Sequence, residues 1–468
     1  MTISELVSRI NDFVWGPFML ALLVGTGVFL TIRLDFLPWR NLGFALRQVF
    51  AKQPKGGTAG DISPFQSLMT ALAATVGVGN IAGVATAMVL GGPGALVWMM
   101  VSALFGLSTK YGESVLAVRF RVRNKNGEMA GGPMYALKNG FPVQWLGTLL
   151  AILFSVFAVT SSLGVGNFTQ SNTIAEAFRI TFSIDPRITG LVTAAAAGAV
   201  LMGGIRNVGK VCGLMVPTMA VLYIFGTLWV IFDNIGNIPS GMALILKQAF
   251  SFQAMGGGAA GTVIANAIRY GVARGVFSNE AGLGSAPIAA AAAKTDHPSR
   301  QGYINMTGTF FDTIVICTLT GLAIASSGIL GAADASGGEL SGAALTIAVF
   351  EKSMGDAGRY IVTIGIALFA FSTILGWEYY GEKSLEFLTG SSRANTAYRA
   401  VYSVMIFFGA LIAMKTVWNL SDTINGLMAF PNLICLLVLS GVIKKECLDF
   451  QKKIIEGNKR SRASPSKR

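Results

Sequence analysis

The longest uncharged stretch of the chain limits most strongly what this protein can fold into. Residues 62–109 contain no Asp, Glu, Lys or Arg over 48 positions. A run of about 18 or more apolar residues is typical of a membrane-spanning helix, so this stretch can hold two. Its centre nevertheless reads GVGNIAGVAT (77–86). Glycine destabilises a helix by about 1 kcal/mol relative to alanine, and a buried asparagine without partners costs on the order of several kcal/mol.

The whole chain has the composition of an integral membrane protein. Of its 468 residues, 53% are hydrophobic and only 13% are charged, whereas soluble domains are roughly 25% charged. Alternation with period two is absent, which argues against a β-barrel. The first 18 residues lack the positive start and the cleavage site of a signal peptide, and they predict a short amphipathic helix. The four cysteines imply no disulfide framework.

The hydropathy pattern predicts an all-α polytopic membrane protein with about 11 transmembrane helices. The loops are short except 331–359, where we expect a surface helix at 345–354. The spans are expected at about 14–32, two within 62–109 with a break near 91–94, 143–178, 188–205, 211–232, 258–293, 303–330, 361–380, 400–414 and 417–443.

The basic residues of the loops predict the orientation of the chain. With the basic tail in the cytoplasm, 26 Lys and Arg residues lie on the cytoplasmic side and 7 on the opposite side. This asymmetry follows the positive-inside rule and places the N-terminus outside. It also explains the net charge of +13 without a nucleic acid partner. The tail is expected to be disordered and to contact anionic lipid.

An internal repeat organises the spans. GNIAGVA (79–85) and SNEAGLG (278–284) share Asn, Ala and Gly in register, and each opens a group of five spans. Because five is odd, the second group crosses the membrane with opposite polarity. The repeat predicts one N-terminal helix plus a 5+5 inverted-repeat core with two broken helices, as in secondary transporters. The expected units are 1–61 (amphipathic segment, first span and basic loop), 62–234 and 235–443 (the two five-helix repeats) and 444–468 (the basic cytoplasmic tail).

The glycines of the first copy predict an unwound turn in the membrane. Gly77, Gly79 and Gly83 let the backbone leave the helix, and the freed polar groups need partners that lipid cannot supply. The helix that restarts near Asn80 would present its positive end to a substrate carboxylate. The carbonyls of residues 73–77 suit an ammonium or a bare cation. The alternative is close packing of small residues on neighbouring helices, which does not explain Asn80.

The second copy lies within ARGVFSNEAGLGSAP (273–287) and contains Glu280 at mid-membrane depth. An ionisable residue at this depth is a functional candidate by default, here for gating or a proton-linked step. The alternative is a structural ion pair with Arg274 or Lys110. Phe277 either caps a pocket or packs in the core.

Two long stretches resemble a known family. SPFQSLMTALAATVGVGNIAGVATAM (63–88) and RGVFSNEAGLGSAPIAAAAA (274–293) are similar to the signature stretches of the alanine/glycine:cation symporter family, and the resemblance covers essentially the whole chain. VGVGN (76–80) is also similar to the first broken helix of neurotransmitter:sodium symporters, which share the leucine-transporter fold. The resemblance implies sodium-coupled, or alternatively proton-coupled, symport of alanine, glycine or another small neutral amino acid into the cell by alternating access.

The resemblance also implies a binding site. Each assignment has an alternative: Ser-Thr pairs bond back to their own helix, Trp377 can be an interfacial anchor, and Gln170 can join two helices. The implied substrate-binding residues are Thr75, Gly77, Val78, Gly79, Asn80, Gln170, Phe277, Asn279 and Trp377, the implied sodium ligands are Ala73, Val76, Ser372 and Thr373, and Glu280 and Arg274 are the expected gating or proton-linked residues.

Three other classes of protein fit the sequence less well. An enzyme would need a convergent nucleophile and base or a metal cluster, and the single histidine, His297, falls in a predicted loop. A channel could also use broken helices, but the asymmetric repeat argues against it, and a sensor would carry an appended soluble domain. We therefore expect no enzymatic activity and no cofactor beyond a coupling sodium ion. The expected setting is a monomer in the inner (cytoplasmic) membrane, with a small neutral amino acid, sodium and the lipid bilayer as partners.

Overall fold

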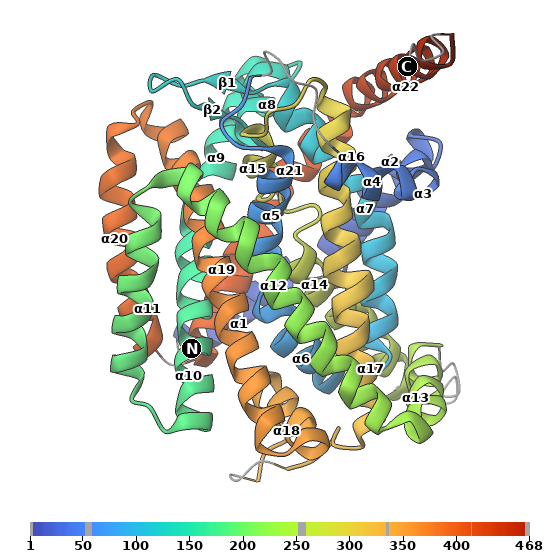
Figure 1. Ribbon diagram of the computed structural model, residues 1–468, viewed down its shortest axis with the longest axis vertical. Coiled ribbons are helices and arrows are strands. Elements are labelled where there is room, and N and C mark those ends of the chain that lie inside the picture. The colour runs from blue at the N-terminus through green and yellow to red at the C-terminus, as the bar shows by residue number, and fades with distance from the viewer. Residues whose placement is uncertain (1–2, 52–58, 251–258, 334–336, 413, 464–468) are drawn as a thin grey trace, which may run out of the picture.

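The structure, a computed structural model, describes residues 3–51, 59–250, 259–333, 337–412 and 414–463. Long helices run side by side through the molecule, and a small hairpin lies at one end (Figure 1). The hairpin pairs β1 (Val122–Arg123) antiparallel with β2 (Met129–Ala130). The helical elements of the first half are α1 (Ile3–Val14), α2 (Pro17–Arg33), α3 (Leu37–Arg40), α4 (Leu42–Phe50), α5 (Pro64–Thr75), η1 (Gly79–Gly83), α6 (Val84–Leu90), α7 (Ala95–Arg119), α8 (Pro133–Gly140), α9 (Gln144–Leu163), η2 (Gly164–Phe168), α10 (Thr169–Phe182), α11 (Pro186–Leu201) and α12 (Gly204–Asp233).

The second half of the chain is equally helical. Three of the elements labelled η, namely η1, η2 and η4, are π-helical segments inside longer helices, and η3 is a 3₁₀ turn. The elements are η3 (Ile235–Asn237), α13 (Ile238–Phe250), α14 (Ala259–Asn279), α15 (Pro287–Ala291), α16 (Pro298–Thr309), η4 (Phe310–Cys317), α17 (Thr318–Ser327), α18 (Gly342–Met354), α19 (Asp356–Thr389), α20 (Arg393–Leu411), α21 (Met414–Val438) and α22 (Ser440–Ala463).

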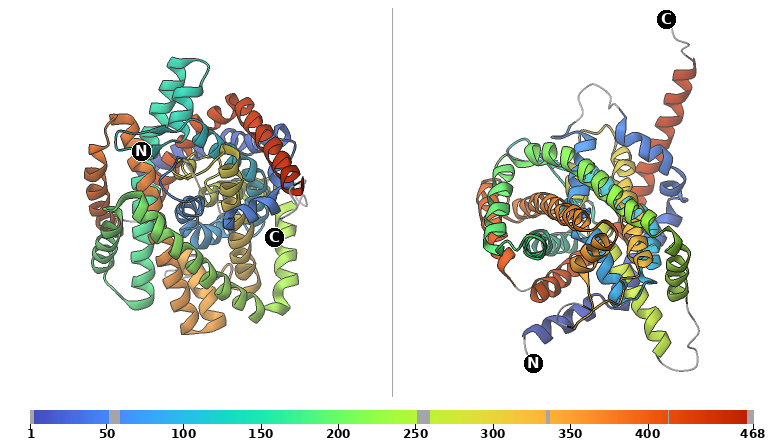
Figure 2. Two further views of the ribbon diagram at one scale, coloured as in Figure 1. Left: turned by 45° about the horizontal axis from the view of Figure 1, so that its top comes forward. Right: turned by 60° about the horizontal axis from the view of Figure 1, so that its bottom comes forward.

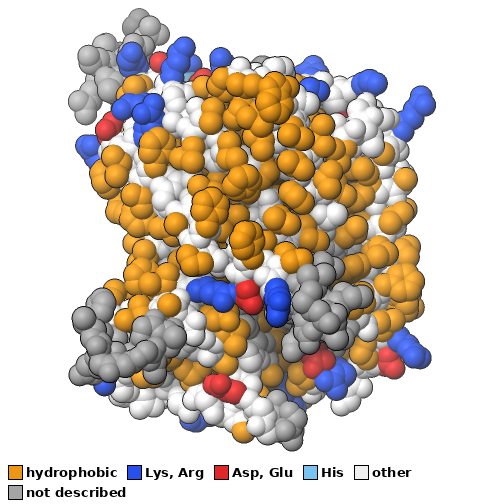
Figure 3. Space-filling view, turned by 180° about the vertical axis from the view of Figure 1, so that it is seen from behind, with side chains coloured by type: hydrophobic (Ala, Val, Ile, Leu, Met, Phe, Trp, Pro, Cys, Tyr) orange, Lys and Arg blue, Asp and Glu red, His pale blue; other side chains and the backbone are white. Residues whose placement is uncertain are grey.

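The outer surface of the molecule is that of a membrane protein. Hydrophobic side chains form a broad band, and charged side chains gather above and below it (Figure 3). On α12, Phe225, Trp229 and Phe232 are 60–69% exposed, an arrangement that water disfavours and lipid accommodates. Among the described residues, six helices are long and apolar enough to cross a membrane, and α5 with η1–α6 forms one further, bent span. The protein is therefore a multi-pass membrane protein.

The predicted cytoplasmic loops gather at one end of the molecule. The elements α3, α4, α8, β1, β2 and α22 lie at the top of Figure 1, whereas α13 and α18 lie at the bottom. The right-hand view of Figure 2 places α1 and α22 at opposite ends. These elements thus lie on two opposite sides of the helical bundle.

The predicted helix at 345–354 is confirmed, and the prediction of a disordered tail was wrong, because tertiary contacts order a segment that looks solvated in the sequence. The predicted surface helix is α18, but Leu345, Val349 and Phe350 bury one face of it. The tail predicted to be disordered continues as helix α22 through Ala463. Phe450 of this helix is buried, and its ring contacts that of Tyr303 in α16.

The start of α5 is fixed by its own cap and by the second repeat. Ser63 and Gln66 form a capping box, in which each side chain bonds the other residue's backbone N–H, and this arrangement stabilises a helix start. Ile62 pairs in parallel with Ala293, just beyond α15. Arg121, next to the hairpin, donates to the carbonyls of 291 and 293. The two segments that carry the helix breaks are thus tied together at this end.

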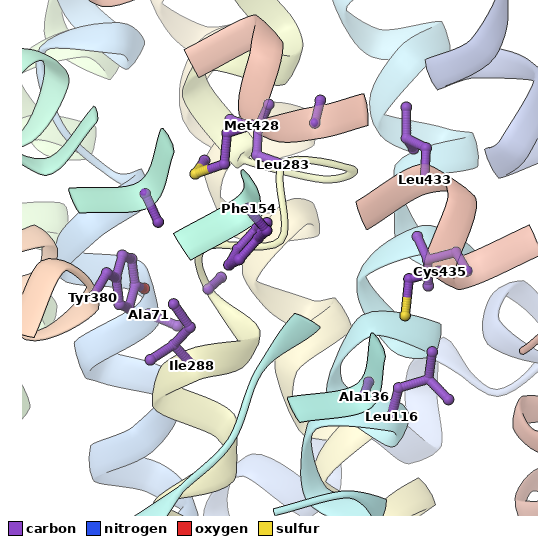
Figure 4. Packing of buried hydrophobic residues seen from close by; sticks show 14 of the residues in the cluster. Ala71, Leu116, Ala136, Phe154, Leu283, Ile288, Tyr380, Met428, Leu433 and Cys435 are labelled. Carbon is purple, nitrogen blue, oxygen red and sulfur yellow. The ribbon is translucent and has the colours of Figure 1, made fainter. Parts of the chain in front are cut away.

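A hydrophobic core surrounds the breaks. Phe154 of α9 and Met428 of α21 lie against Leu283 in the segment between α14 and α15 (Figure 4). Tyr380 of α19 lies close to Ile288 of α15 in the same view. Helices from both halves of the chain thereby hold the broken segments in place.

Candidate functional site

The helix that begins with α5 breaks at the predicted glycine-rich turn. α5 ends at Thr75 and η1 begins at Gly79, with a bend of 49° between the two halves. Asn80 supports the turn, because its Oδ1 accepts the backbone N–H of Gly77 at 2.9 Å. Its role at the break resembles that of the Glu or Gln of a capping box, whose side chain reaches back three positions to a free backbone N–H.

Two glycines of the break allow other helices to approach closely. A Cβ on Gly77 would collide with Oγ1 of Thr373 in α19, and a Cβ on Gly79 would lie 3.1 Å from the Cα of Ser278 in α14. A Cβ on Gly83 would meet nothing nearer than 3.9 Å. Packing of small residues therefore accounts for Gly79 but not for Gly83.

The second break separates α14 from α15. Gly282 and Gly284 have φ angles of 99° and 82°, which glycine adopts without penalty. Glu280 has a φ of 56°, a left-handed conformation that costs a residue with a side chain roughly 1–2 kcal/mol. Strain of this kind clusters at functional sites.

Glu113 of α7 holds the second break in its shape. Its Oε1 accepts the N–H groups of Gly282 (3.0 Å) and Gly284 (3.1 Å), as well as Nδ2 of Asn432 in α21 (2.7 Å). The sequence analysis did not select Glu113. The sequence signal that could have selected it is its position: Glu113 is a carboxylate only four positions after the uncharged stretch 62–109.

A second residue that the sequence analysis missed joins the two breaks. Asp312, in η4, is fully buried and accepts hydrogen bonds from Nδ2 of Asn80 (2.8 Å) and from Oγ of Ser278 (2.9 Å). Asn80 belongs to the first break, and Ser278 lies at the end of α14. The signal for Asp312 was a lone carboxylate inside the predicted span 303–330, which is a functional candidate by the rule that selected Glu280.

Glu280 is buried, and its closest partners differ from those suggested by the sequence. Its Oε2 accepts a hydrogen bond from Ser285 at 2.6 Å. Arg274 bonds both carboxylate oxygens of Asp422 in α21. The ammonium of Lys110 is close enough to act electrostatically on Glu280, and it donates to the carbonyl of Asn279 at 2.7 Å.

The predicted sodium ligands of α19 face the first break. Oγ of Ser372 and Oγ1 of Thr373 lie 3.2 Å and 3.0 Å from the carbonyl oxygen of Ala73. Both hydroxyls also lie within 3.0 Å of the carbonyl of Phe369. The pair is therefore back-bonded to its own helix and directed at Ala73 at the same time.

The side chains of the residues that follow Ala73 are less suited to bind a ligand than those of Ser372 and Thr373. Thr75 bonds back to the carbonyl of Ala71 at 3.1 Å, and the side chains of Val76 and Val78 are buried in an apolar cluster. A binding role for the two valines would come from their backbone groups.

Gln170 of α10 lies beside the first break. Its Nε2 donates to the carbonyl of Val165 in η2 at 2.9 Å, so the amide bonds within its own helical segment and does not join two helices. Its Oε1 is buried without a hydrogen-bond partner among the described residues and lies 3.7 Å from where a Cβ on Gly77 would be. An unpaired oxygen at this place is available to a ligand.

Two aromatic residues enclose the same region. The indole of Trp377 is 1% exposed and lies close to Glu280, which excludes a role as an interfacial anchor. Phe277 approaches the first break, since its Cδ1 lies 3.4 Å from where a Cβ on Gly79 would be. The guanidinium of Arg274 lies over the Phe277 ring, 5.4 Å from the centroid.

Asn279 bonds to η4 and to its own segment. Its Nδ2 donates to Thr313 in η4 at 3.0 Å, and its Oδ1 accepts the N–H of Ala281. The structure therefore brings Gly77, Gly79, Asn80, Gln170 and Phe277 together at the first break, and Trp377 packs against η2, which precedes Gln170. Thr75, Asn279 and Arg274 make other contacts.

The site is shielded from bulk water and is rich in oxygen atoms. The side chains of Thr75, Gln170, Phe277, Asn279 and Trp377 are at most 6% exposed. Within the described ranges, no three His, Cys, Asp or Glu residues are grouped to hold a metal ion. Carbonyl and hydroxyl oxygens suit a hard cation, so the donor set beside Ala73 fits an alkali cation better than a transition metal.

Comparisons with known proteins show the family of the chain. The model of the sodium:alanine symporter family matches residues 1–464. The sodium/alanine symporter AgcS of Methanococcus maripaludis is 52% identical over 450 residues, which cover 96% of this chain and 98% of that protein. The probable sodium/glutamine symporter GlnT of Bacillus subtilis is 39% identical over 449 residues, covering 96% and 91%.

Solved structures show the fold of the chain. The crystal structure of MhsT in complex with L-phenylalanine superposes with a TM-score of 0.54 at 14% identity, covering 84% of this chain and 98% of that one. A Na⁺-coupled sialic acid symporter superposes with a TM-score of 0.51 at 12% identity, covering 93% and 86%. Both have the leucine-transporter fold. With this fold, and with a family model that spans nearly the whole sequence, the chain belongs to the sodium:alanine symporter family, a family of sodium-coupled amino acid transporters.

Proposed function

We propose that this protein imports alanine or glycine together with sodium. The observation that carries the proposal is the pair of hydroxyls on Ser372 and Thr373 that face the carbonyl of Ala73 at the first break. A sodium ion at this place would join α5 to α19. Its binding would bias the direction in which the site opens, to the extent that it binds one conformation more tightly than the other.

The amino acid would bind on the other side of the same break. Backbone groups of residues 77–79 would hold its carboxylate and ammonium, and Gln170 would supply the unpaired Oε1. Trp377 and Phe277, both buried beside the breaks, would limit the substrate to a small side chain. The 52% identical relative AgcS is named a sodium/alanine symporter, and this supports the choice of substrate.

The remaining features of the proposal concern organisation and coupling. We propose eleven spans built as one N-terminal helix plus a 5+5 inverted repeat over 62–234 and 235–443, in a monomer of the inner membrane with the N-terminus outside. Each repeat would begin with a broken helix, α5–η1–α6 and α14–α15.

The second candidate function is proton-coupled symport of the same amino acids. It is favoured by two buried carboxylates, those of Glu280 and Asp312.

Uptake into proteoliposomes tests the proposal. The panel contains alanine, glycine, leucine and glutamine, each with an inward sodium gradient, with an inward proton gradient, or with neither. We expect concentrative uptake of alanine and glycine with sodium alone, and little uptake of leucine. Equal uptake with the proton gradient in sodium-free buffer would favour the second candidate, and preferred uptake of glutamine would contradict the substrate assignment.

A further inference from the structure

A groove with a mainly hydrophobic lining lies at the surface of the molecule, away from both breaks. Its volume is about 590 Å³, which falls within the range of roughly 300–1,000 Å³ that is typical of ligand pockets. Three helices contribute hydrophobic side chains to it. They include Leu20, Ala21 and Val24 of α2, Trp98 of α7, and Ile268 and Val272 of α14.

The surroundings of the groove indicate that it opens toward lipid. Phe13 of α1 and Phe18 of α2 are 84% and 71% exposed, and they flank Gly16 and Pro17, which line the groove. Exposed phenylalanines of this kind suit a membrane better than water. Tryptophan is enriched at the membrane–water boundary, and Trp98 lines the groove as well. The groove therefore follows the first half of α2 from the boundary into the membrane.

The groove also carries two opposite charges, near the junction of α1 and α2. Arg269 and Asp12 both line it, and Nη2 of Arg269 lies 2.5 Å from Oδ1 of Asp12. Their side chains are 32% and 62% exposed, so a ligand can reach both. Arg269 also lines a smaller recess of about 40 Å³ together with Asn11. Oδ1 of Asn11 is buried and has no hydrogen-bond partner among the described residues, so it can accept one from a ligand.

This arrangement matches the chemistry of a phospholipid that bears a phosphate and a primary ammonium. The guanidinium of Arg269 suits the phosphate, the carboxylate of Asp12 and Oδ1 of Asn11 suit the ammonium, and the hydrophobic walls suit an acyl chain. We propose that the groove binds phosphatidylethanolamine. An exposed ion pair contributes little stability, so Arg269 and Asp12 can each exchange the other for the opposite charge of the headgroup. An anionic headgroup would leave Asp12 beside a phosphate with no ammonium to compensate.

The site goes beyond the proposed function, because lipid binding does not require transport. It nevertheless contacts the transport machinery. Arg269, Ile268 and Val272 all belong to α14, the helix that ends at the second break. A lipid held against these residues would favour whichever position of α14 it binds more tightly.

Native mass spectrometry of the full chain, released from nanodiscs that contain equal amounts of phosphatidylethanolamine and phosphatidylglycerol, tests the site. We expect the unmodified protein to retain phosphatidylethanolamine at least several-fold more often. Arg269→Gln with Asp12→Asn should retain both lipids equally. Arg179→Gln with Glu176→Gln removes an exposed ion pair of α10 and is the matched control, which should keep the preference. Size-exclusion profile and thermal unfolding verify that each variant is folded.

A second variant keeps the test decisive if the Arg269 and Asp12 double variant does not fold. Ala21→Trp fills the groove from an exposed position of α2 and leaves the ion pair in place, so retention of phosphatidylethanolamine should fall several-fold. Equal retention of the two lipids by the unmodified protein would overturn the headgroup assignment. A preference that survives Ala21→Trp would mean that the lipid binds elsewhere, and the inference would then be wrong.

Discussion

At the scale of single residues, the indole of Trp377 sets the proposed limit on substrate size. It packs against η2, where a Cβ on Gly166 would collide with it, and its ring lies 5.6 Å from that of Tyr380. Because both neighbours are buried, the indole cannot move aside for a larger substrate without displacing them.

Replacing this side chain should widen the range of substrates. Each methylene that does not fit a closed pocket costs roughly 1–3 kcal/mol, so Trp377→Ala should raise leucine uptake relative to alanine uptake at least about tenfold. Competition assays in proteoliposomes measure the ratio. Trp229→Ala removes an indole that is 60% exposed on α12 and should leave the ratio unchanged. Equal uptake of leucine and alanine by the unmodified protein would contradict the pocket assignment.

The only histidine should not contribute to pH dependence. Burial and the nearby Lys453 lower the pKa of His297 to about 4, so it stays neutral between about pH 5 and 8, where a histidine usually titrates. Its Nδ1 caps α16 by accepting the N–H of Ser299, a role that asparagine can fill. His297→Asn should therefore leave the pH profile of alanine uptake unchanged. A displaced profile in a folded variant would show that His297 titrates during transport.

At the scale of elements, Glu113 makes the second break a fixed structure. One oxygen of its carboxylate accepts hydrogen bonds from donors in the break and in α21. The N–H groups of Gly282 and Gly284 point away from any helical partner, and lipid offers no substitute. The shape of the break thus depends on a residue of another helix.

Removing that acceptor should destabilise the protein. Glu113→Ala leaves three buried donors without their partner, at about 1–3 kcal/mol for each unsatisfied group. We expect a clear fall in the thermal unfolding temperature in detergent, together with loss of alanine uptake. Glu113→Gln keeps a carbonyl oxygen at the same place, so it should lower the unfolding temperature less and retain more alanine uptake. If the alanine variant proves as stable as the unmodified protein, Glu113 does not hold the break.

The sequence predicted the elements better than the contacts between them. Both breaks and the helices around them follow from local signals, since glycine and hydropathy act within one segment. The partner of Arg274 does not, because Asp422 lies 148 positions away and nothing local specifies which helix α14 faces. Asp312 did have a local signal, a carboxylate inside a predicted span, but its contacts with Asn80 and Ser278 could not be predicted from it. Its importance appears only when η4 is packed against both breaks.

At the scale of the whole molecule, the charge asymmetry predicts the orientation in the membrane. The elements expected in the cytoplasm lie at the same end as α22, and α13 lies at the other end (Figure 1). Lys247 on α13 and Lys452 on α22 are both exposed, so each marks one face of the protein.

Labelling of single cysteines tests this orientation. In a cysteine-free background, an impermeant thiol reagent added to intact cells should label Lys247→Cys but not Lys452→Cys. The second cysteine should react only after the membrane is opened. Labelling of both cysteines in intact cells would mean that the two ends of the core lie on the same side, and the eleven-span topology would then be wrong.

The central claim is that a sodium ion joins the first break to α19 and thereby drives uptake of the amino acid. The most direct test is the sodium dependence of alanine uptake by the double variant Ser372→Ala with Thr373→Val. Because both replacements suit a buried apolar helix, the protein should fold, while two oxygen ligands are lost. We expect the sodium concentration for half-maximal uptake to rise at least several-fold, and the affinity for alanine to fall with it. Unchanged sodium dependence in the folded double variant would contradict the account and leave the two hydroxyls as back-bonded features of their own helix.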